Sequence, residues 1–271
     1  MKRSWKLVFL LLPFSLSAFE IKPWYPTIYQ FEFRPSFTVQ HYPQVDNAVN
    51  PKNYSSTDEI LTLNLGIPFT PNWDIQIETE LDNTKKRSFG LLSGGLQLRY
   101  QLLDDISGDP FSLTVGMSYR GVPYNRLEDV STPYHFVSNF EVHSAIGKEL
   151  ARRSTWIFRT FAFLGAGIAN KGSPWLRPLV SFETNIQDRH QIELFAEGYF
   201  GFGDQSKVNI RRFSGYQNIE HRSIDGAIVY RRIFAIWGSL EFQFLRRLYA
   251  HSYPERLNAF TVTYRLPFSI F

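Results

Sequence analysis

Cysteine is absent from the 271 residues of this chain, so neither disulfides nor thiolate metal sites are available to it. The chain also lacks any apolar run of the roughly 18 to 20 residues that a membrane-spanning helix requires, which excludes a helical membrane topology. A marked excess of one charge is missing as well: 29 Lys and Arg face 25 Asp and Glu, and the bases Lys2, Arg3 and Lys6 lie at the N-terminus. The remainder is nearly neutral and holds no basic module interleaved with aromatics, so we expect no nucleic-acid partner.

The N-terminus has the pattern of a secretory signal peptide. Its basic residues are followed by an apolar stretch over 7–14 and by a short segment that ends at Ala18. We expect cleavage after Ala18, which divides the chain into a signal peptide at 1–18 and one domain at 19–271. Cleavage after Ser17 and an uncleaved anchor are the alternatives, because Leu16 is larger than the residue usual at that position.

Twelve segments alternate apolar and polar residues, with turn-forming residues between them, which is typical of β-strands with one apolar and one polar face. An even number allows antiparallel neighbours to close into a barrel with both chain ends on one side. The segments are 27–40, 58–67, 72–81, 91–103, 110–120, 134–148, 154–169, 175–187, 191–202, 223–231, 235–249 and 257–271.

The last segment alternates most regularly, with apolar residues at every second position from Phe260 to Ile270 and Phe271 out of phase. An exported chain that ends in such a strand resembles the Gram-negative outer-membrane β-barrel proteins, in a generic porin-like form. The resemblance implies an all-β fold: a 12-stranded antiparallel transmembrane β-barrel, preceded by a signal peptide and located in the bacterial outer membrane. It also implies outer-membrane lipid, lipopolysaccharide and the barrel-insertion machinery as partners. Alternation alone would equally suit a soluble barrel or sandwich with its apolar face inward.

The signal peptide, the strand number, the terminal Phe and the aromatic residues favour the membrane form. With the N-terminus on the periplasmic side, the odd-numbered connections become external loops, at 41–57, 82–90, 121–133, 170–174, 203–222 and 250–256. The fourth of these loops is as tight as a hairpin turn, so loop length alone does not fix the orientation. Six aromatic residues on the apolar faces then fall near the periplasmic interface, where such barrels carry an aromatic girdle. They are Trp73, Tyr100, Phe111, Trp156, Tyr230 and Tyr264.

Charges within the strands lie on the polar face, and those on the apolar face occur only near strand ends. An Arg at the middle of a bilayer costs about 2–4 kcal/mol, which accounts for this exclusion and places the charges in the lumen. The predicted lumen-lining charged residues are Glu32, Arg34, Asp74, Glu78, Arg99, Glu141, Arg159, Arg177, Glu183, Glu193, Glu197, Glu241 and Arg265. Glu80, Arg120, Asp225, Arg231 and Arg247 share the same parity.

Three cross-strand ion pairs follow from hairpin geometry, because directly opposite residues have a constant index sum. We predict that Asp74 lies opposite Arg99, Arg159 opposite Glu183, and Glu241 opposite Arg265, with a register slack of two residues.

The barrel width suggests the function. Eight strands give an interior that side chains fill, whereas 16 to 18 leave an open channel, and twelve lies between. We therefore hypothesise a narrow passive pore for small polar solutes. The alternative is a structural or interaction protein of the outer membrane whose barrel is plugged by ion pairs and which displays its loops.

Two basic clusters are predicted at the outer rim, and they are candidate ligands for anions or lipopolysaccharide phosphates. Their members are Lys85, Lys86, Arg87, Lys207, Arg211 and Arg212. Ordinary solvated loop charge is the alternative. The loop at 203–222 is long enough to fold into the mouth as a constriction, with its two arginines setting an anion-attracting field.

A lipid hydrolase is the third hypothesis, because some twelve-stranded outer-membrane barrels cleave lipids. His135 and Ser138 lack the spacing of the phospholipase A motif, in which one residue separates the His from Ser-Asn-Gly. His143 and Ser144 are adjacent and therefore point to opposite faces of a strand. No histidines have metal-ligand spacing. We predict no enzymatic activity, no metal and no cofactor.

Overall fold

The computed structural model describes residues 19–26, 28–152 and 155–269. The predicted signal peptide at 1–18 and the C-terminal residues Ile270 and Phe271 lie outside the described residues. Among the described residues, no helix has the length and apolar character to cross a membrane.

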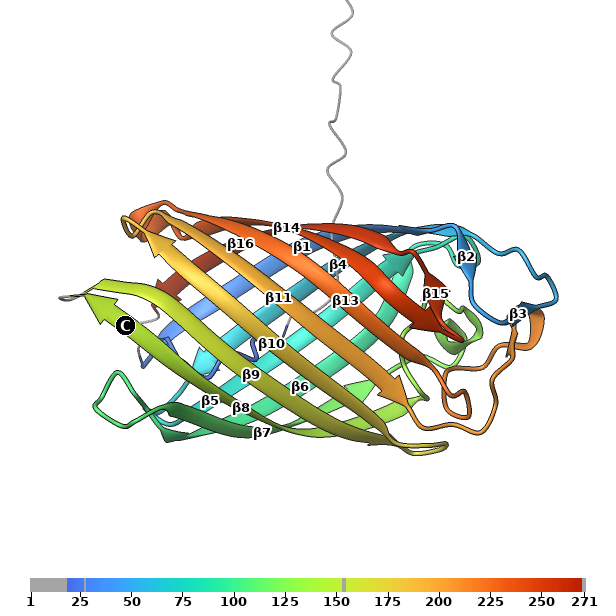
Figure 1. Cartoon of the computed structure of the whole chain (residues 1–271), viewed down its shortest axis with the longest axis horizontal. Helices are drawn as coiled ribbons and strands as arrows, with labels where there is room; N and C mark the ends of the chain where they lie inside the picture. Colours follow the sequence, from blue (N-terminus) through green and yellow to red (C-terminus); the bar gives the residue numbers. More distant parts are fainter. Residues whose placement is uncertain (1–18, 27, 153–154, 270–271) are drawn as a thin grey trace, which may run out of the picture.

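Twelve tilted strands form one closed antiparallel barrel, in which each strand pairs with its neighbours in the chain and the first strand pairs with the last (Figure 1). This confirms the predicted fold class and strand number. The barrel strands are β1 (Gln30–Tyr42), β4 (Ser56–Pro68), β5 (Trp73–Asn83), β6 (Gly90–Leu103), β7 (Ser112–Gly121), β8 (Ser138–Arg152), β9 (Thr155–Ala169), β10 (Trp175–Ile186), β11 (His190–Gly201), β13 (Arg222–Ile233), β14 (Ser239–His251) and β16 (Asn258–Ser269).

The strands β14 and β8 begin about four residues later than predicted, at Ser239 and Ser138, and the local backbone explains both differences. Residues Ala235–Trp237 form a 3₁₀ turn, η3, that ends at Gly238. Gly238 has a φ of 87°, which favours glycine, and a Cβ there would lie 2.0 Å from the carbonyl oxygen of Arg265. At the other strand, the Asn139 side chain accepts from the backbone N–H of His135 at 3.2 Å and bends the chain before β8.

The wall has its apolar face outward. Ile77 and Leu194 are 48% and 52% exposed, whereas Glu78 and Arg99, on the opposite parity, are each 1% exposed. A soluble barrel would have the reverse arrangement, because it must bury its apolar face and leave its charges in water. The outward apolar wall and the buried charges are therefore those of a barrel surrounded by hydrocarbon.

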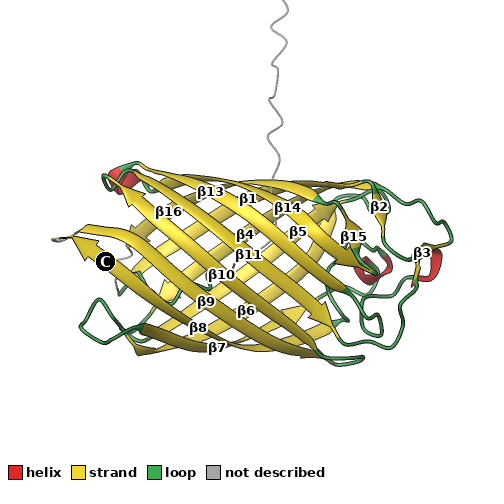
Figure 2. Ribbon diagram, viewed as in Figure 1, coloured by secondary structure: helices red, strands yellow, loops and turns green. Residues whose placement is uncertain are grey.

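The two ends of the barrel differ. One end has short turns, and the other carries longer loops that hold the 3₁₀ turns Arg126–Glu128 (η1) and Ile210–Arg212 (η2) (Figure 2). At the short-turn end, the rings of Trp73 and Tyr100 contact each other with centroids 4.7 Å apart, as the predicted girdle requires.

Contacts between the long loops form a cap over the outer mouth. The short strands β2 (Gln44–Val45) and β15 (Pro254–Glu255) pair with each other, as do β3 (Ala48–Val49) and β12 (Val208–Asn209). Beneath these pairs Tyr216 is fully buried, and its hydroxyl donates to the carbonyl oxygen of Val130 at 2.8 Å. The cap joins the first, third, fifth and sixth external loops into one packed unit.

The fifth external loop covers the mouth, but its arginines do not enter it. Arg211 and Arg212 are exposed on the outside of the cap, whereas the aromatic Phe213 and Tyr216 point inward and are buried. The two arginines therefore do not line the mouth, and the anion-attracting field stays a prediction. Burying an aromatic ring is favourable, whereas burying an unpaired guanidinium is costly, and this preference decides which side of the loop faces in.

Candidate functional site in the barrel lumen

The inward face of the wall carries several groups of ion pairs. Each predicted lumen-lining residue takes part in at least one pair, and Arg120, Arg231 and Arg247 do so as well. The pairs are Glu32–Arg265, Arg34–Glu20, Asp74–Arg99, Glu78–Arg120, Glu141–Arg177, Arg159–Glu149, Glu183–Arg231, Glu193–Lys22, Glu197–Arg177, Asp225–Arg247 and Glu241–Arg265.

Two of the three predicted cross-strand ion pairs form. Asp74 lies directly opposite Arg99, with the carboxylate 2.7 Å from the guanidinium. Glu241 contacts Arg265 at 3.2 Å, although the residue directly opposite Arg265 is Ser239. The register is thus displaced by two residues, within the predicted slack, and the long arginine side chain spans the difference.

The third pair is wrong as an ion pair although its register is right. Arg159 lies opposite Glu183 across β9 and β10, as predicted. It also lies opposite Glu149 on β8, and its guanidinium contacts that carboxylate at 2.5 Å. Glu183 instead contacts Lys22 at 3.2 Å and Arg231 at 3.5 Å. A residue in a central strand has two cross-strand neighbours, and hairpin geometry considers only one of them.

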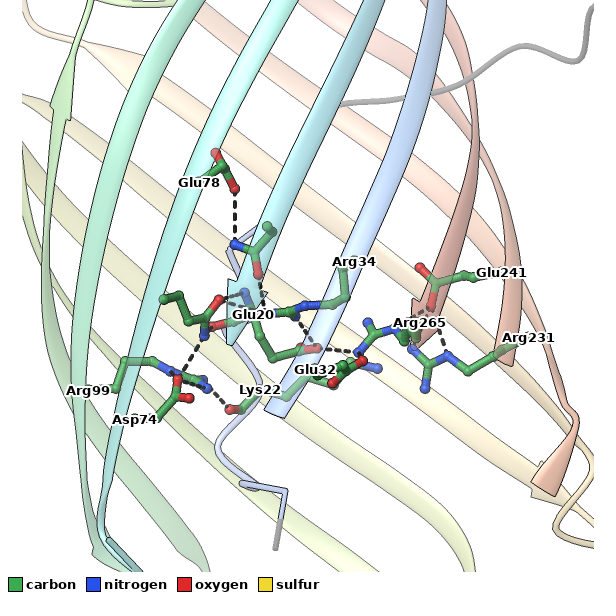
Figure 3. Close-up of polar contacts among 12 residues, drawn as sticks. Glu20, Lys22, Glu32, Arg34, Asp74, Glu78, Arg99, Arg231, Glu241 and Arg265 are labelled. Atoms are coloured by element: carbon green, nitrogen blue, oxygen red, sulfur yellow. Dashed lines mark hydrogen bonds and ion pairs between the residues drawn. The ribbon is translucent and has the colours of Figure 1, made fainter. Parts of the chain in front are cut away.

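The lumen holds a segment that sequence reasoning did not place there. Residues 19–26, here called the strap, run inside the barrel before β1 begins (Figure 3). The carboxylate of Glu20 lies 3.1 Å from Arg34 and 2.7 Å from Arg265. Two residues later, the ammonium of Lys22 lies 2.6 Å from Glu193 and 3.2 Å from Glu183. The strap therefore joins a basic part of the wall, on β1 and β16, to an acidic part, on β10 and β11.

Apolar side chains and glycines also contribute to the contacts between the strap and the wall. The Trp24 indole N–H donates to Asp105, in the turn after β6, at 2.9 Å. Gly147 faces the strap so closely that a Cβ would lie 2.8 Å from Pro23. Gly95 does the same farther along the lumen, where a Cβ would lie 2.8 Å from the ring of Phe19. These two glycines leave the space that the strap occupies.

Two cavities follow one another along the lumen. A cavity of about 100 Å³ is bordered by Phe19, Glu20 and Lys22 on one side and by Glu193 and Arg231 of the wall on the other. A second cavity, of about 200 Å³, lies toward the cap and is lined by Glu141, Arg177, Tyr134 and Tyr253. Phe19 and Glu197 line both. Most of the residues that line the two cavities bear charged or hydroxyl groups, and apolar side chains such as Phe161, Leu179 and Trp175 complete the linings.

Two buried histidines lie where the cap meets the barrel. The Nε2 atoms of His135 and His221 are 3.0 Å apart, so one ring donates a hydrogen bond and the other accepts it. The His135 ring lies 4.4 Å from that of Trp175, and the His221 ring is stacked 5.1 Å from that of Tyr253. Burial lowers the pKa of His135 to about 3 and that of His221 well below its usual range. Both rings are therefore neutral at pH 7.

The predicted outer-rim cations fall into two groups. Lys85, Lys86 and Arg87 join loops to one another: Lys86 donates to the carbonyl oxygens of Glu128 and Ile210, and Arg87 pairs with the Glu128 carboxylate. Lys207, Arg211 and Arg212 are exposed on the cap. The lipopolysaccharide contact stays a prediction, and the second group has the accessible charges for it.

The residues considered for catalysis have other partners. The imidazole of His135 contacts His221, and the Ser138 hydroxyl lies 3.2 Å from the Tyr119 hydroxyl on the outer wall. Within residues 19–26, 28–152 and 155–269, no group of three or more His, Asp or Glu side chains is arranged to hold a metal ion.

Sequence reasoning missed Glu20 and Lys22 because it began the barrel at the first strand. A signal was present: Phe19 and Ile21 alternate with these two charges, so the period-two pattern starts directly after the predicted cleavage site. What the pattern could not supply was the location of the segment, which depends on contacts with residues up to 245 positions away.

Neither a protein-family model nor a curated protein matches this sequence. Solved structures do share its fold. A COG4313 outer membrane channel from Pseudomonas putida F1 is 10% identical, with a TM-score of 0.69 over 94% of this chain and 100% of that one. The NanC porin is 8% identical, with a TM-score of 0.58 over 86% and 97% of the two chains. The KdgM porin is 10% identical, with a TM-score of 0.52 over 88% and 99%. The chain therefore has the architecture of an outer-membrane, porin-like β-barrel.

Proposed function

We propose that this protein is a narrow passive channel of the outer membrane for small polar solutes, and that it acts without catalysis. The likeness to channel and porin barrels supports the general class. Outer-membrane lipid and lipopolysaccharide surround the barrel in this proposal, with Lys207, Arg211 and Arg212 of the cap as the phosphate contacts.

The polar, incompletely filled lumen carries the proposal. The wall encloses cavities of about 100 and 200 Å³ that are lined by ionised groups. A barrel built only for stability would fill this space with interdigitating side chains, since unfilled volume forfeits packing energy. Ionised walls beside unfilled volume suit water and small polar solutes.

The strap narrows this path, and the ion pairs that hold it, beside the apolar contacts of Ile21 and Trp24, can be exchanged for water. Its charged side chains pair with Arg34, Arg265, Glu183 and Glu193 of the wall. If the strap leaves, water can hydrate those wall groups and the strap side chains alike, so the lost ion pairs are largely compensated. We therefore expect the channel to alternate between a narrow state with the strap seated and a wider state with it released.

Ion conductance of the full-length protein in planar lipid bilayers tests the proposal. We expect small, intermittent currents from the unmodified protein and larger, longer-lived currents from the Glu20→Ala/Lys22→Ala double variant. The matched control is Glu220→Ala/Arg222→Ala, which removes an acid–base pair of the same spacing from the exposed part of the chain. The control should behave like the unmodified protein.

Silence of all three proteins, each shown to be folded by heat-dependent mobility on gels, would remove the channel proposal. Equal currents from the strap variant and the control would support a channel but would show that the strap does not restrict it.

A further inference from the structure

The strap is bound by the wall in the manner of a peptide ligand. The side-chain amide of Gln76 accepts from the backbone N–H of Glu20 at 2.7 Å and donates to the carbonyl oxygen of the same residue at 3.1 Å. Arg99 donates to the carbonyl oxygen of Lys22 at 2.8 Å, and Gln101 donates to that of Pro23 at 3.3 Å. Three wall residues therefore recognise main-chain groups, which any extended peptide presents.

The side chains of the strap enter separate subsites. The first is basic: Arg34 and Arg265 hold the Glu20 carboxylate at 3.1 and 2.7 Å, and the exposed fractions of their side chains are only 5% and 17%. The second is acidic: Glu183 and Glu193 hold the Lys22 ammonium at 3.2 and 2.6 Å. Because the subsites lie on different parts of the wall, they fix the direction of the bound chain as well as its charges.

A third subsite accepts an aromatic ring. The guanidinium of Arg120 lies 5.0 Å from the centre of the Phe19 ring, within the range of a cation–π contact. Gly95 makes room for the same ring, because a Cβ at this position would lie 2.8 Å from it. The wall thus provides for three consecutive features of the strap: a ring, a carboxylate one residue later and an ammonium two residues after that.

We propose that the solutes recognised by this lumen are short extended peptides bearing an acidic residue and, two positions later, a basic one. This inference rests on the proposed channel function and names its substrate class. Residues 19–23 occupy the peptide site as an internal ligand, so an incoming peptide competes with the strap for the same groups. Simple ions and sugars carry charge or hydroxyl groups, but they do not offer the paired N–H and C=O that Gln76 binds.

Peptide block of the ion current tests the proposal. The probe is the acetylated and amidated pentapeptide Phe-Glu-Ile-Lys-Pro, which has the sequence of residues 19–23. Its matched control is Phe-Lys-Ile-Glu-Pro, which has the same composition and net charge with the charges exchanged. Both are added to the full-length Glu20→Ser/Lys22→Ser variant in planar bilayers, since this variant keeps the chain but vacates both ionic subsites.

We expect the native order to block the current at a concentration lower by about tenfold or more, because the exchanged order sets like charges against each other at both subsites. Introducing Glu193→Gln into the same variant should reduce this preference, since the ammonium loses one of its two partners. Equal block by the two peptides, or block by neither, would overturn the proposal.

The conductance of the variant without peptide tests the channel itself, so the two proposals fail separately. If the variant does not conduct, calorimetric titration of the two peptides into the same folded protein in detergent still decides whether the site distinguishes their order. A current that neither peptide changes would support the channel proposal and contradict the proposal that peptides are its substrates.

Discussion

Acidification should open the outer cap, because the cap is closed over two neutral histidines. His135 and His221 are 1% and 0% exposed, and their Nε2 atoms share one hydrogen bond at 3.0 Å. The groups packed around them are Trp175, Tyr199, Tyr216 and Tyr253, which are uncharged at neutral pH, and Arg247, which further disfavours a second cation. A proton added to either ring therefore acquires no counter-ion in the closed cap.

The lowered pKa of His135 determines how strongly acid favours the open cap. His135 titrates at about 3 in the closed cap and near its ordinary value of 6.5 when the loops are open and hydrated. Above pH 6.5 both states are neutral, and this residue gives no pH dependence. Below pH 6.5 the open state binds a proton that the closed state does not bind. The stability of the closed state relative to the open state therefore falls by about 1.4 kcal/mol per pH unit until pH 3. At about pH 5 this amounts to roughly 2 kcal/mol, or a thirtyfold shift toward the open cap. His221 adds to it, because its pKa is lowered in the same direction.

Hydrogen exchange measured by mass spectrometry over residues 202–221 gives the readout, once rates are corrected for the intrinsic effect of pH. We expect exchange in this loop to increase relative to the barrel strands between about pH 7.5 and 5. The His135→Phe/His221→Phe double variant keeps aromatic rings but cannot be protonated, so it should lose the response. An unchanged exchange ratio in the unmodified protein, or an equal response in the variant, would refute the reasoning.

Three further predictions concern the strap and the wall. Gly147→Ala places a methyl group 2.8 Å from the strap, so we expect a higher open probability in bilayer recordings. Gly94→Ala, whose Cβ meets nothing nearer than 4.0 Å, serves as the control, and equal behaviour of the two variants would contradict the close contact between Gly147 and the strap. Asp74→Ala leaves the buried Arg99 without its counter-ion and should lower the free energy of unfolding by about 3–5 kcal/mol in urea titrations, whereas a loss below about 1 kcal/mol would show that water reaches this pair. Ile77→Arg sets a charge on the exposed outer wall and should cost about 2–4 kcal/mol in lipid vesicles; an unchanged stability there would place this residue away from the hydrocarbon.

The architecture was predictable because one physical constraint acts on every strand. A side-chain period of two gives each residue one of two faces, and an error of one position would expose Glu78 to lipid and bury Ile77. The pattern therefore placed nearly all wall charges correctly. It also located Asp74 opposite Arg99, although a bulge between Glu80 and Leu81 shifts the register nearer the loop.

Contacts that depend on more than one hairpin were not predictable in this way. Arg159 had the expected partner opposite it and still paired with Glu149 on its other side. The Glu241–Arg265 register moved by two residues, because the loop between β14 and β16 contains β15, which is committed to pairing with β2 in the cap. The strap was missed altogether, since no local pattern says that a segment preceding the first strand returns into the barrel.

The location of the strap also determines how the protein can respond to its surroundings. A plug held by apolar packing alone would leave dry walls when released. This strap combines the apolar packing of Ile21 and Trp24 with the ion pairs of Glu20 and Lys22, whose partners carry opposite charges on different parts of the wall. Because these side chains are largely buried, salt screens the contacts only weakly, whereas a solute with a suitably spaced acid and base competes for both at once. The same four wall groups therefore hold the narrow state and recognise the solute that ends it, so that binding of the solute and widening of the path are one exchange of partners.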